Sequence, residues 1–340
     1  MDSVSQFALG AAVGLAALGR HTAPWKAALW GGWVGTLPDL DALLDYGDAV
    51  SNMTLHRAES HSIFWQSLAS PFIAAAIAAV DRGVPRFAER FGRWWVAAWL
   101  VLVTHALLDA ATVYGTQLAL PFSNHPFGLA SIFIIDPLYT LPLLVGLAAT
   151  LLARSPGRLR WNRIGLALST GYLGWAVLAQ AHVSGVVREQ LAERGTQPER
   201  VLVTPAPFNT VLWRVVAMYP DAYDEGFYSL LDRGRDIRFD RFPRNAGLYA
   251  EAAAVPAVAR IAWFSKGFFR MDERDGRVTI TDLRMGQEPF YVFSFEVARR
   301  ASPLAAVKPT DVGGRDGMDV GRTFGWLGRR LLGEDLQPPR

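Results

Sequence analysis

Long stretches with almost no charge fill the first half of the sequence, and they limit its possible folds more than any other feature. A helix that crosses the hydrocarbon core of a bilayer needs about 20 apolar residues. The segments that meet or approach this length are 63–80, 94–114, 131–153 and 164–182. Two shorter apolar segments, 4–18 and 25–37, precede them and are expected to form a helical hairpin. Residues 1–183 are therefore expected to be a polytopic α-helical membrane domain in contact with bilayer lipid.

The second half carries most of the charge and has runs rich in Val, Ile, Phe, Trp and Tyr, which favour strands. Strands are expected at 210–219, 259–271, 277–283 and 291–297. Asp275 and Gly276 are a hairpin turn signal between two of these strands. Helices are expected at 184–194 and 246–258. We therefore expect residues 184–300 to form a small α+β domain with an antiparallel sheet.

Residues 301–340 are rich in Gly, Pro and Arg, and we expect them to form a flexible tail. Apolar residues and arginines lie close together between Phe324 and Leu332. This combination is typical of a short helix that lies in the membrane interface. The tail is therefore expected to be flexible outside one candidate interfacial helix.

The positions of Lys and Arg predict how the apolar segments are oriented. The first, third and fifth connecting loops hold ten of them, whereas the intervening loops hold only Arg57. The ten are Arg20, Lys26, Arg82, Arg86, Arg90, Arg93, Arg154, Arg158, Arg160 and Arg163. Cytoplasmic loops carry an excess of basic residues. The loops 39–61 and 114–131 and everything after His182 are therefore expected on the outer side of a bacterial cytoplasmic (inner) membrane.

Two absences narrow the functions that the chain can have. The sequence contains no cysteine, so a metal ion would have to be held by nitrogen and oxygen ligands. The net charge is +3, but the basic residues are spread through turns and strands and form no stripe with interleaved aromatics. No nucleic-acid partner is therefore expected.

His105 and Asp109 are ionisable residues inside an apolar segment, where such groups are costly and need a partner or a function. They are four residues apart, so they share one face of a helix. A single His–Asp hydrogen bond between helices would also explain them. The pair therefore indicates either helix packing or part of a metal site.

Two carboxylates, Asp39 and Asp41, follow the end of a short apolar segment at Pro38. Helix capping or a turn would account for one of them. His56 and His61 precede the next apolar segment, and an irregular helix start would let both imidazoles face one point. A polar interface loop is the alternative. Both pairs are therefore candidate metal ligands as well as candidate structural groups.

The predicted orientation places all of these residues, together with Asp136, at the same membrane face. A mixed set of imidazoles and carboxylates suits Zn²⁺, Mn²⁺ or Fe²⁺. Zinc is the expected metal, and surplus ligands would allow a second ion. The predicted ligands are Asp39, Asp41, His56, His61, His105 and Asp109.

The same motifs resemble a known family. They resemble the bacterial YdjM-like inner-membrane proteins, described as LexA-binding, membrane-bound metal-dependent hydrolases. The matching pieces are Met1-Asp2, 10–14, 35–41, His56-Arg57, His61-Ser62, 104–109, 114–117 and 135–137. Ala58, Glu59 and Ser60 depart from the family pattern, while both histidines remain. The resemblance covers most of the first half and implies a metal site and a hydrolase.

We therefore expect a metal-dependent hydrolase that acts at the outer membrane face on an ester or phosphoester, such as that of a lipid or an envelope precursor. Arg57 would hold the anionic group, and Glu59 or Asp136 would act as base or orient a ligand. A membrane protein that only binds metal or acts as a scaffold is the main alternative. A transporter is a third, although it predicts ionisable groups near the middle of the membrane.

Overall fold

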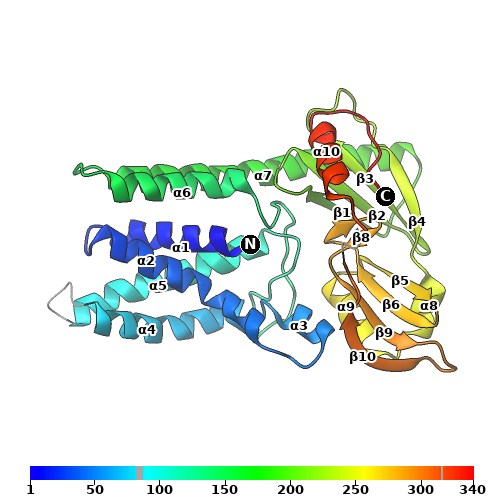
Figure 1. Cartoon of the computed structure of the whole chain (residues 1–340), viewed down its shortest axis with the longest axis horizontal. Coiled ribbons are helices and arrows are strands. Elements are labelled where there is room, and N and C mark those ends of the chain that lie inside the picture. Colours follow the sequence, from blue (N-terminus) through cyan, green and yellow to red (C-terminus); the bar gives the residue numbers. More distant parts are fainter. Residues whose placement is uncertain (82–86, 315–316) are drawn as a thin grey trace. The chain divides into compact units, whose positions relative to one another are not determined.

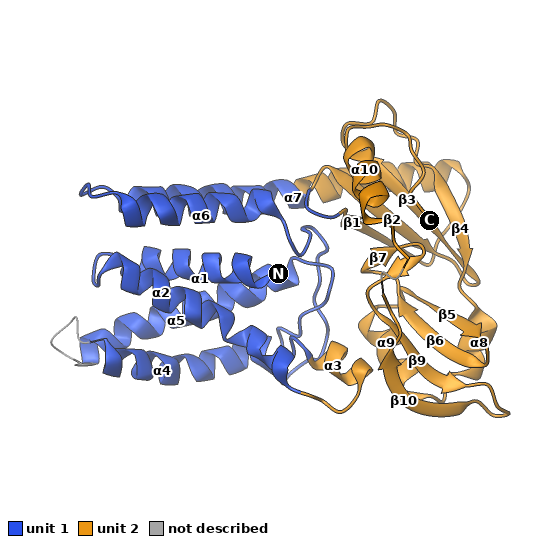
Figure 2. Cartoon of the chain, in the orientation of Figure 1, with its two compact units in different colours: residues 1–44, 56–177, 207–209 blue, residues 45–55, 178–206, 210–340 orange. Residues whose placement is uncertain are grey.

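The computed structural model describes residues 1–81, 87–314 and 317–340. The chain divides into two compact units, which are coloured separately in Figure 2. The first unit comprises residues 1–44, 56–177 and 207–209, and the second comprises 45–55, 178–206 and 210–340. Arg82 and Arg86, which contributed to the predicted orientation, lie outside the described residues.

The first unit is a bundle of helices (Figure 1). Its elements are α1 (Ser3–Leu18), α2 (Pro24–Thr36), the 3₁₀ turns η1 (Pro38–Leu43) and η2 (Glu59–His61), α4 (Ile63–Val80), α5 (Phe87–Ala110), α6 (Pro137–Leu152) and the first part of α7 (Leu159–Glu193). Among the residues that the structure describes, three helices are long and apolar enough to cross a membrane: Ile63–Val80, Ala88–Ala110 and Leu159–Glu193. The helices α1 and α6 are apolar but shorter. The predicted helical N-terminal domain is confirmed.

The helix α1 packs against α2, α5 and α6 and is the centre of the bundle. Leu15 of α1, Val101 of α5 and Leu143 of α6 are all buried in its apolar core. Many large apolar residues on the other faces are exposed, among them Phe72 and Leu152. A helix with apolar residues on all sides fits a hydrocarbon environment. The bundle therefore has the surface of a membrane domain.

Glycines allow α1 and α2 to pack in close contact. Gly10 and Gly14 on α1 face Gly31 and Gly35 on α2, and a Cβ atom on Gly14 would lie 2.8 Å from the Gly31 Cα. Glycines four residues apart permit this close backbone approach between membrane helices. The short helical hairpin expected from the sequence is held together by this contact.

Replacing Gly31 with alanine is expected to destabilise the bundle by about 1–3 kcal/mol, because the new methyl group would meet the backbone of α1. The measurement is the thermal unfolding midpoint of the full chain in detergent. Gly171→Ala is the matched control, since a Cβ atom there meets nothing within 4 Å. Equal midpoints for the two variants would show that the contact is not tight.

The second unit contains antiparallel sheets, as expected for the C-terminal α+β region. One sheet has the order β1-β2-β3-β4, another β10-β9-β6-β5, and β7 pairs with β8. The strands are β1 (Arg200–Pro205), β2 (Leu212–Met218), β3 (Ala222–Ser229), β4 (Phe239–Pro243), β5 (Phe269–Arg274), β6 (Arg277–Asp282), β7 (Gly286–Gln287), β8 (Phe290–Tyr291), β9 (Ser294–Arg299) and β10 (Ala305–Asp311). The helices are α3 (Ala49–Leu55), the end of α7, α8 (Ala246–Glu251), α9 (Pro256–Phe264) and α10 (Val320–Leu331).

Several element boundaries differ from the prediction. The segment 259–271, expected to be a strand, forms most of α9 and the start of β5. Pro256 is at the first turn of α9, where its missing N–H costs nothing, and Val258, Ile261 and Phe264 bury one helical face. The apolar segment 164–182 and the helix expected at 184–194 form one continuous helix, α7. The helix expected from residue 131 begins only at Pro137.

The segment expected to be a flexible tail contains β10 and α10. Trp326 of α10 is buried against Phe227, and its Nε1 donates to the Leu336 carbonyl oxygen at 3.1 Å. Arg330 follows four residues later, on the same helical face, and pairs with Asp232 at 2.6 Å. Trp326 and Arg330 of α10 thus pack within the second unit, whereas Phe324 is exposed.

Candidate metal centre

Four acidic and imidazole side chains converge within the first unit. Asp39 lies in η1 and His61 ends η2, while His105 and Asp109 lie one turn apart on α5. Pro38 begins the turn that carries Asp39, and the Ser62 hydroxyl caps α4 directly after His61. Local turn chemistry at two helix ends therefore presents Asp39 and His61 to α5.

The ligand atoms of this cluster are close together. His61 Nε2 lies 3.0 Å from Asp109 Oδ2 and 3.0 Å from His105 Nε2. Asp39 Oδ1 lies 3.5 Å from both Nε2 atoms, and His105 Nε2 lies 3.5 Å from Asp109 Oδ2. Ligands about 2.0–2.1 Å from a tetrahedral zinc ion are separated by about 3.3 Å. The separations therefore match those of four ligands around a single small cation.

The second ring nitrogen of each histidine has a partner that fixes its tautomer. His105 Nδ1 lies 2.7 Å from the Gly35 carbonyl oxygen, which can only accept, so this nitrogen donates. Ser60 Oγ donates to Asp41 Oδ2 and lies 2.8 Å from His61 Nδ1, so that Nδ1 also donates. In the neutral rings both Nε2 atoms then carry lone pairs that face each other and two carboxylates. A metal cation at the centre would offset the repulsion within this set of acceptors, as would a proton on one of the rings.

Burial increases the free-energy cost of placing these acceptors next to one another. His61, His105 and Asp109 are at most 1% exposed, whereas the Asp39 side chain is 20% exposed. Acceptors that face one another away from water repel strongly. Asp39 therefore marks the side of the cluster that solvent or a substrate can reach.

Asp109 is held by groups beyond the cluster. Arg57 Nε lies 3.3 Å from Asp109 Oδ2, and Gln6 Nε2 donates to Asp109 Oδ1 at 3.0 Å. The amino group of Met1 also contacts Oδ1. Arg57 is buried, has a positive φ of 65° and stacks over Tyr114. Its guanidinium group therefore has a fixed position beside the carboxylate.

The structure places Asp41 and His56 together beside the cluster. His56 Nδ1 lies 2.7 Å from Asp41 Oδ1, and Asp41 Oδ2 also accepts from the Arg57 backbone N–H at 3.0 Å. Asp41 Oδ2 is 3.7 Å from His61 Nδ1, the nitrogen that points away from the cluster. Asp41 and His56 thus form a pair on the Nδ1 side of His61, away from the cluster.

Electrostatics keep the carboxylates of η1 ionised. Burial raises the pKa of Asp39, but hydrogen bonds from His105 and His61, which form when their Nε2 atoms carry protons, lower it by more, so that the pKa lies well below its usual range. Burial likewise raises the pKa of Asp41, and its hydrogen bond to His56 outweighs this effect. Both groups are therefore carboxylates at neutral pH, the form that binds a metal.

The two acidic residues expected to act as bases lie elsewhere. Glu59 is exposed at the start of η2. Asp136 caps α6, accepts from the Leu138 N–H at 3.0 Å and from the Tyr172 hydroxyl at 2.9 Å. Among the described residues, none of its recorded contacts is with the cluster. These two residues are therefore not brought together with the four candidate ligands.

Sequence reasoning missed two polar partners of the site. Gln6 lies in an apolar helix and is fully buried, and a lone amide in such a segment is the signal that could have found it. The other is the Gly35 carbonyl oxygen, which orients His105. Gly35 has no side chain, and only the tertiary packing of α2 brings its backbone to α5.

A buried polar centre within a bundle of apolar helices defines the class of an integral membrane protein with a candidate metal site. The sequence model of the family described as YdjM inner membrane protein matches residues 1–183, and the chain belongs to this family. An uncharacterised protein of Bacillus subtilis (strain 168), YfhP, is 24% identical over 215 residues. The match covers 61% of this chain and 60% of that relative. No solved structure matches the chain.

Proposed function

We propose that the chain is a membrane-embedded, metal-dependent hydrolase. The observation that carries this proposal is the convergence of Asp39, His61, His105 and Asp109, with both Nε2 lone pairs facing the two carboxylates. Two carboxylates would balance the charge of one divalent ion. Zinc suits this ligand set, and Mn²⁺ or Fe²⁺ are alternatives. A bound divalent ion supplies Lewis-acid chemistry and makes water a stronger nucleophile near neutral pH.

The surrounding residues fit supporting roles in hydrolysis. Arg57 adds a positive charge beside Asp109, which holds the carboxylate in place and favours an anionic substrate group. His56 is oriented by Asp41 and its side chain is 21% exposed, so it can exchange protons with water or with a leaving group. His56 is therefore better placed for proton transfer than Glu59 or Asp136.

The proposed substrate is an ester or phosphoester of a lipid or envelope precursor, and the proposed site of action is the outer face of the inner membrane. Support comes from the apolar bundle around the site and from the excess of basic residues in the alternate loops. We propose that residues 184–300 are extracytoplasmic. A reporter that is active only in the cytoplasm, fused after Arg340, should be inactive, and an active fusion would overturn this orientation.

Metal analysis tests the site directly. The full chain purified in detergent is expected to retain a divalent metal, whereas His105→Ala should bind it at least about 100-fold more weakly, because one of four ligands is lost. Glu59→Gln is the matched control, since it removes a nearby acidic group that lies outside the cluster. Plasma mass spectrometry gives the metal content of each protein. Wild-type protein without metal after reconstitution would refute the proposal.

Hydrolysis requires a separate test. The metal-loaded chain is incubated with a bacterial lipid extract, and the products are identified by mass spectrometry. Products that require both metal and His105 would support the hydrolase. A metal-loaded chain that releases no product would instead favour the alternative of a metal-binding or scaffold membrane protein.

A further inference from the structure

A second polar feature of the bundle is a pocket that lies away from the metal centre. Its lining comes from the end of α1, the turn after it and the start of α7, and the cavity measures about 190 Å³. A single water needs only about 10–15 Å³ of such space, so a phosphate group fits. Gln6, which contacts Asp109, and Leu15, which lines the pocket, are separated by about 14 Å along α1. The pocket is therefore a separate site.

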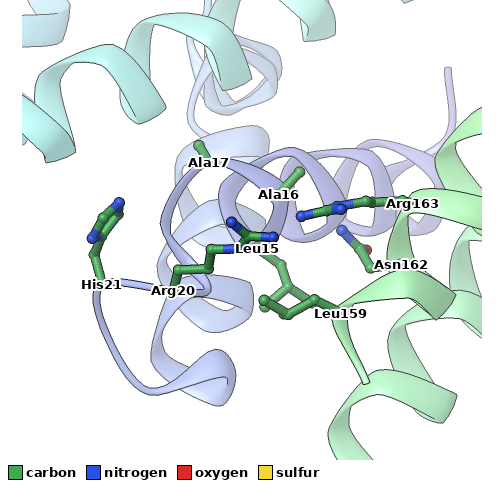
Figure 3. Close-up of a pocket in the computed structure, with 8 residues that line it drawn as sticks. All are labelled: Leu15, Ala16, Ala17, Arg20, His21, Leu159, Asn162 and Arg163. Carbon is green, nitrogen blue, oxygen red and sulfur yellow. The ribbon is translucent and has the colours of Figure 1, made fainter. Parts of the chain in front are cut away.

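Basic side chains surround this pocket. Arg20, His21 and Arg163 line it, and no acidic side chain does so among the described residues. Figure 3 shows the guanidinium groups of Arg20 and Arg163 directed toward one another above Leu15. Within the described part of the chain, neither arginine has an ion-pair partner. Both side chains are exposed, and an anion bound between them would offset their mutual repulsion.

A buried amide forms part of the same wall. Asn162 is 2% exposed, and its Nδ2 donates to the Ala12 carbonyl oxygen at 2.9 Å, which fixes the orientation of the amide. Its Oδ1 has no hydrogen-bond partner among the described residues. The pocket therefore combines two converging cations with an unsatisfied acceptor, a combination that suits a phosphate group attached to a hydroxyl-bearing headgroup.

The rest of the pocket is apolar. Leu15, Ala16, Ala17 and Leu159 line it, and Ile164, which follows Arg163 on α7, is exposed. Cations above an apolar wall match a phospholipid, whose phosphate lies above its acyl chains. We propose that this pocket binds the phosphate group of an anionic phospholipid. The proposal is independent of the hydrolase and of the metal.

Native mass spectrometry of the detergent-purified full chain tests the pocket. The wild type is expected to retain added phosphatidylglycerol about tenfold more strongly than the double variant Arg20→Ala/Arg163→Ala, because two charge-assisted contacts are lost. Arg160→Ala is the matched control: it removes an arginine of α7 that stacks on Trp161 and does not line the pocket. Diacylglycerol with the same acyl chains lacks the phosphate and should not be retained.

Competition with inorganic phosphate shows whether the anion that the pocket binds is a lipid headgroup or free phosphate. If it displaces phosphatidylglycerol only at concentrations far above those of the lipid, the pocket selects a lipid headgroup. If inorganic phosphate binds as tightly as the lipid and diacylglycerol is still not retained, the pocket is a phosphate site whose ligand is free phosphate. Equal retention of phosphatidylglycerol by the double variant and by Arg160→Ala would overturn the proposal. Thermal unfolding of both variants confirms that each is folded.

Discussion

Replacing Asp109 with asparagine is expected to weaken metal binding by more than about 100-fold while the helices remain assembled. Asparagine has the shape of aspartate but lacks its charge, and Asp109 Oδ2 lies 3.0 Å from His61 Nε2 and 3.5 Å from His105 Nε2. The loss also leaves Arg57, which is 2% exposed, without the carboxylate that it contacts. A buried cation without its partner is costly, so a lower unfolding temperature should accompany the loss of metal.

Competition with a chelating metal indicator gives the dissociation constant for each protein. Asp136→Asn is the matched control, because it makes the same chemical change at a buried carboxylate that caps α6. This control should keep the affinity of the wild type. If Asp109→Asn binds metal as tightly as Asp136→Asn does, then Asp109 is not a ligand and the cluster is held together by hydrogen bonds alone.

Helical periodicity explains which part of the site could be predicted. His105 and Asp109 are four residues apart in a long apolar segment, so any helix there places them on one face. This spacing does not determine whether they meet Asp39 and His61, because that contact depends on how η1 and η2 pack against α5. The orientation inferred from loop charge put all four at one membrane face. It could not decide which of the six predicted ligands would meet.

Asp41 and His56 show why the structure brings only four of the six predicted ligands together in one cluster. Residues two apart in a 3₁₀ turn point in different directions, so Asp41 cannot share the direction of Asp39. The positive φ of Arg57 turns the chain between His56 and His61. Spacing in the sequence gave no sign of either feature. Both residues still lie next to the cluster, where they orient His61 through Ser60.

The fold was predictable to the extent that periodicity and turn chemistry decide it. Asp275 and Gly276 form the turn between β5 and β6, both with positive φ, as their residue types indicate. The segment 259–271 has the composition of a strand, yet the burial of one helical face and the proline at the start of α9 make residues 259–264 helical. In α10, the Trp326 ring packs against Phe227, about 100 residues earlier, and this contact has no signal in the local sequence.

In the second unit, the largest expected effect on stability comes from Arg214, a buried residue of β2. Its Nε donates to Glu225 Oε1 at 2.7 Å, its Nη1 to the Leu283 carbonyl oxygen at 2.7 Å and its Nη2 to the Tyr291 hydroxyl at 3.1 Å. Arg214→Met would remove the close partner of Glu225, which is 1% exposed and would keep only the weaker contact with Arg340 at 3.9 Å. The expected cost is about 3–5 kcal/mol, a large part of the stability of an ordinary domain.

A neighbouring ion pair of the same sheet provides the matched control. Arg241 of β4 pairs with Asp224 of β3 at 2.6 Å, but the Arg241 side chain is 59% exposed. Exposed pairs contribute about 1 kcal/mol or less, because water and salt screen them. Hydrogen exchange of β2 and β3 amides in the full chain should therefore accelerate strongly in Arg214→Met and only slightly in Arg241→Met. Similar exchange in both variants would mean that Glu225 finds another partner or takes up a proton when Arg214 is lost.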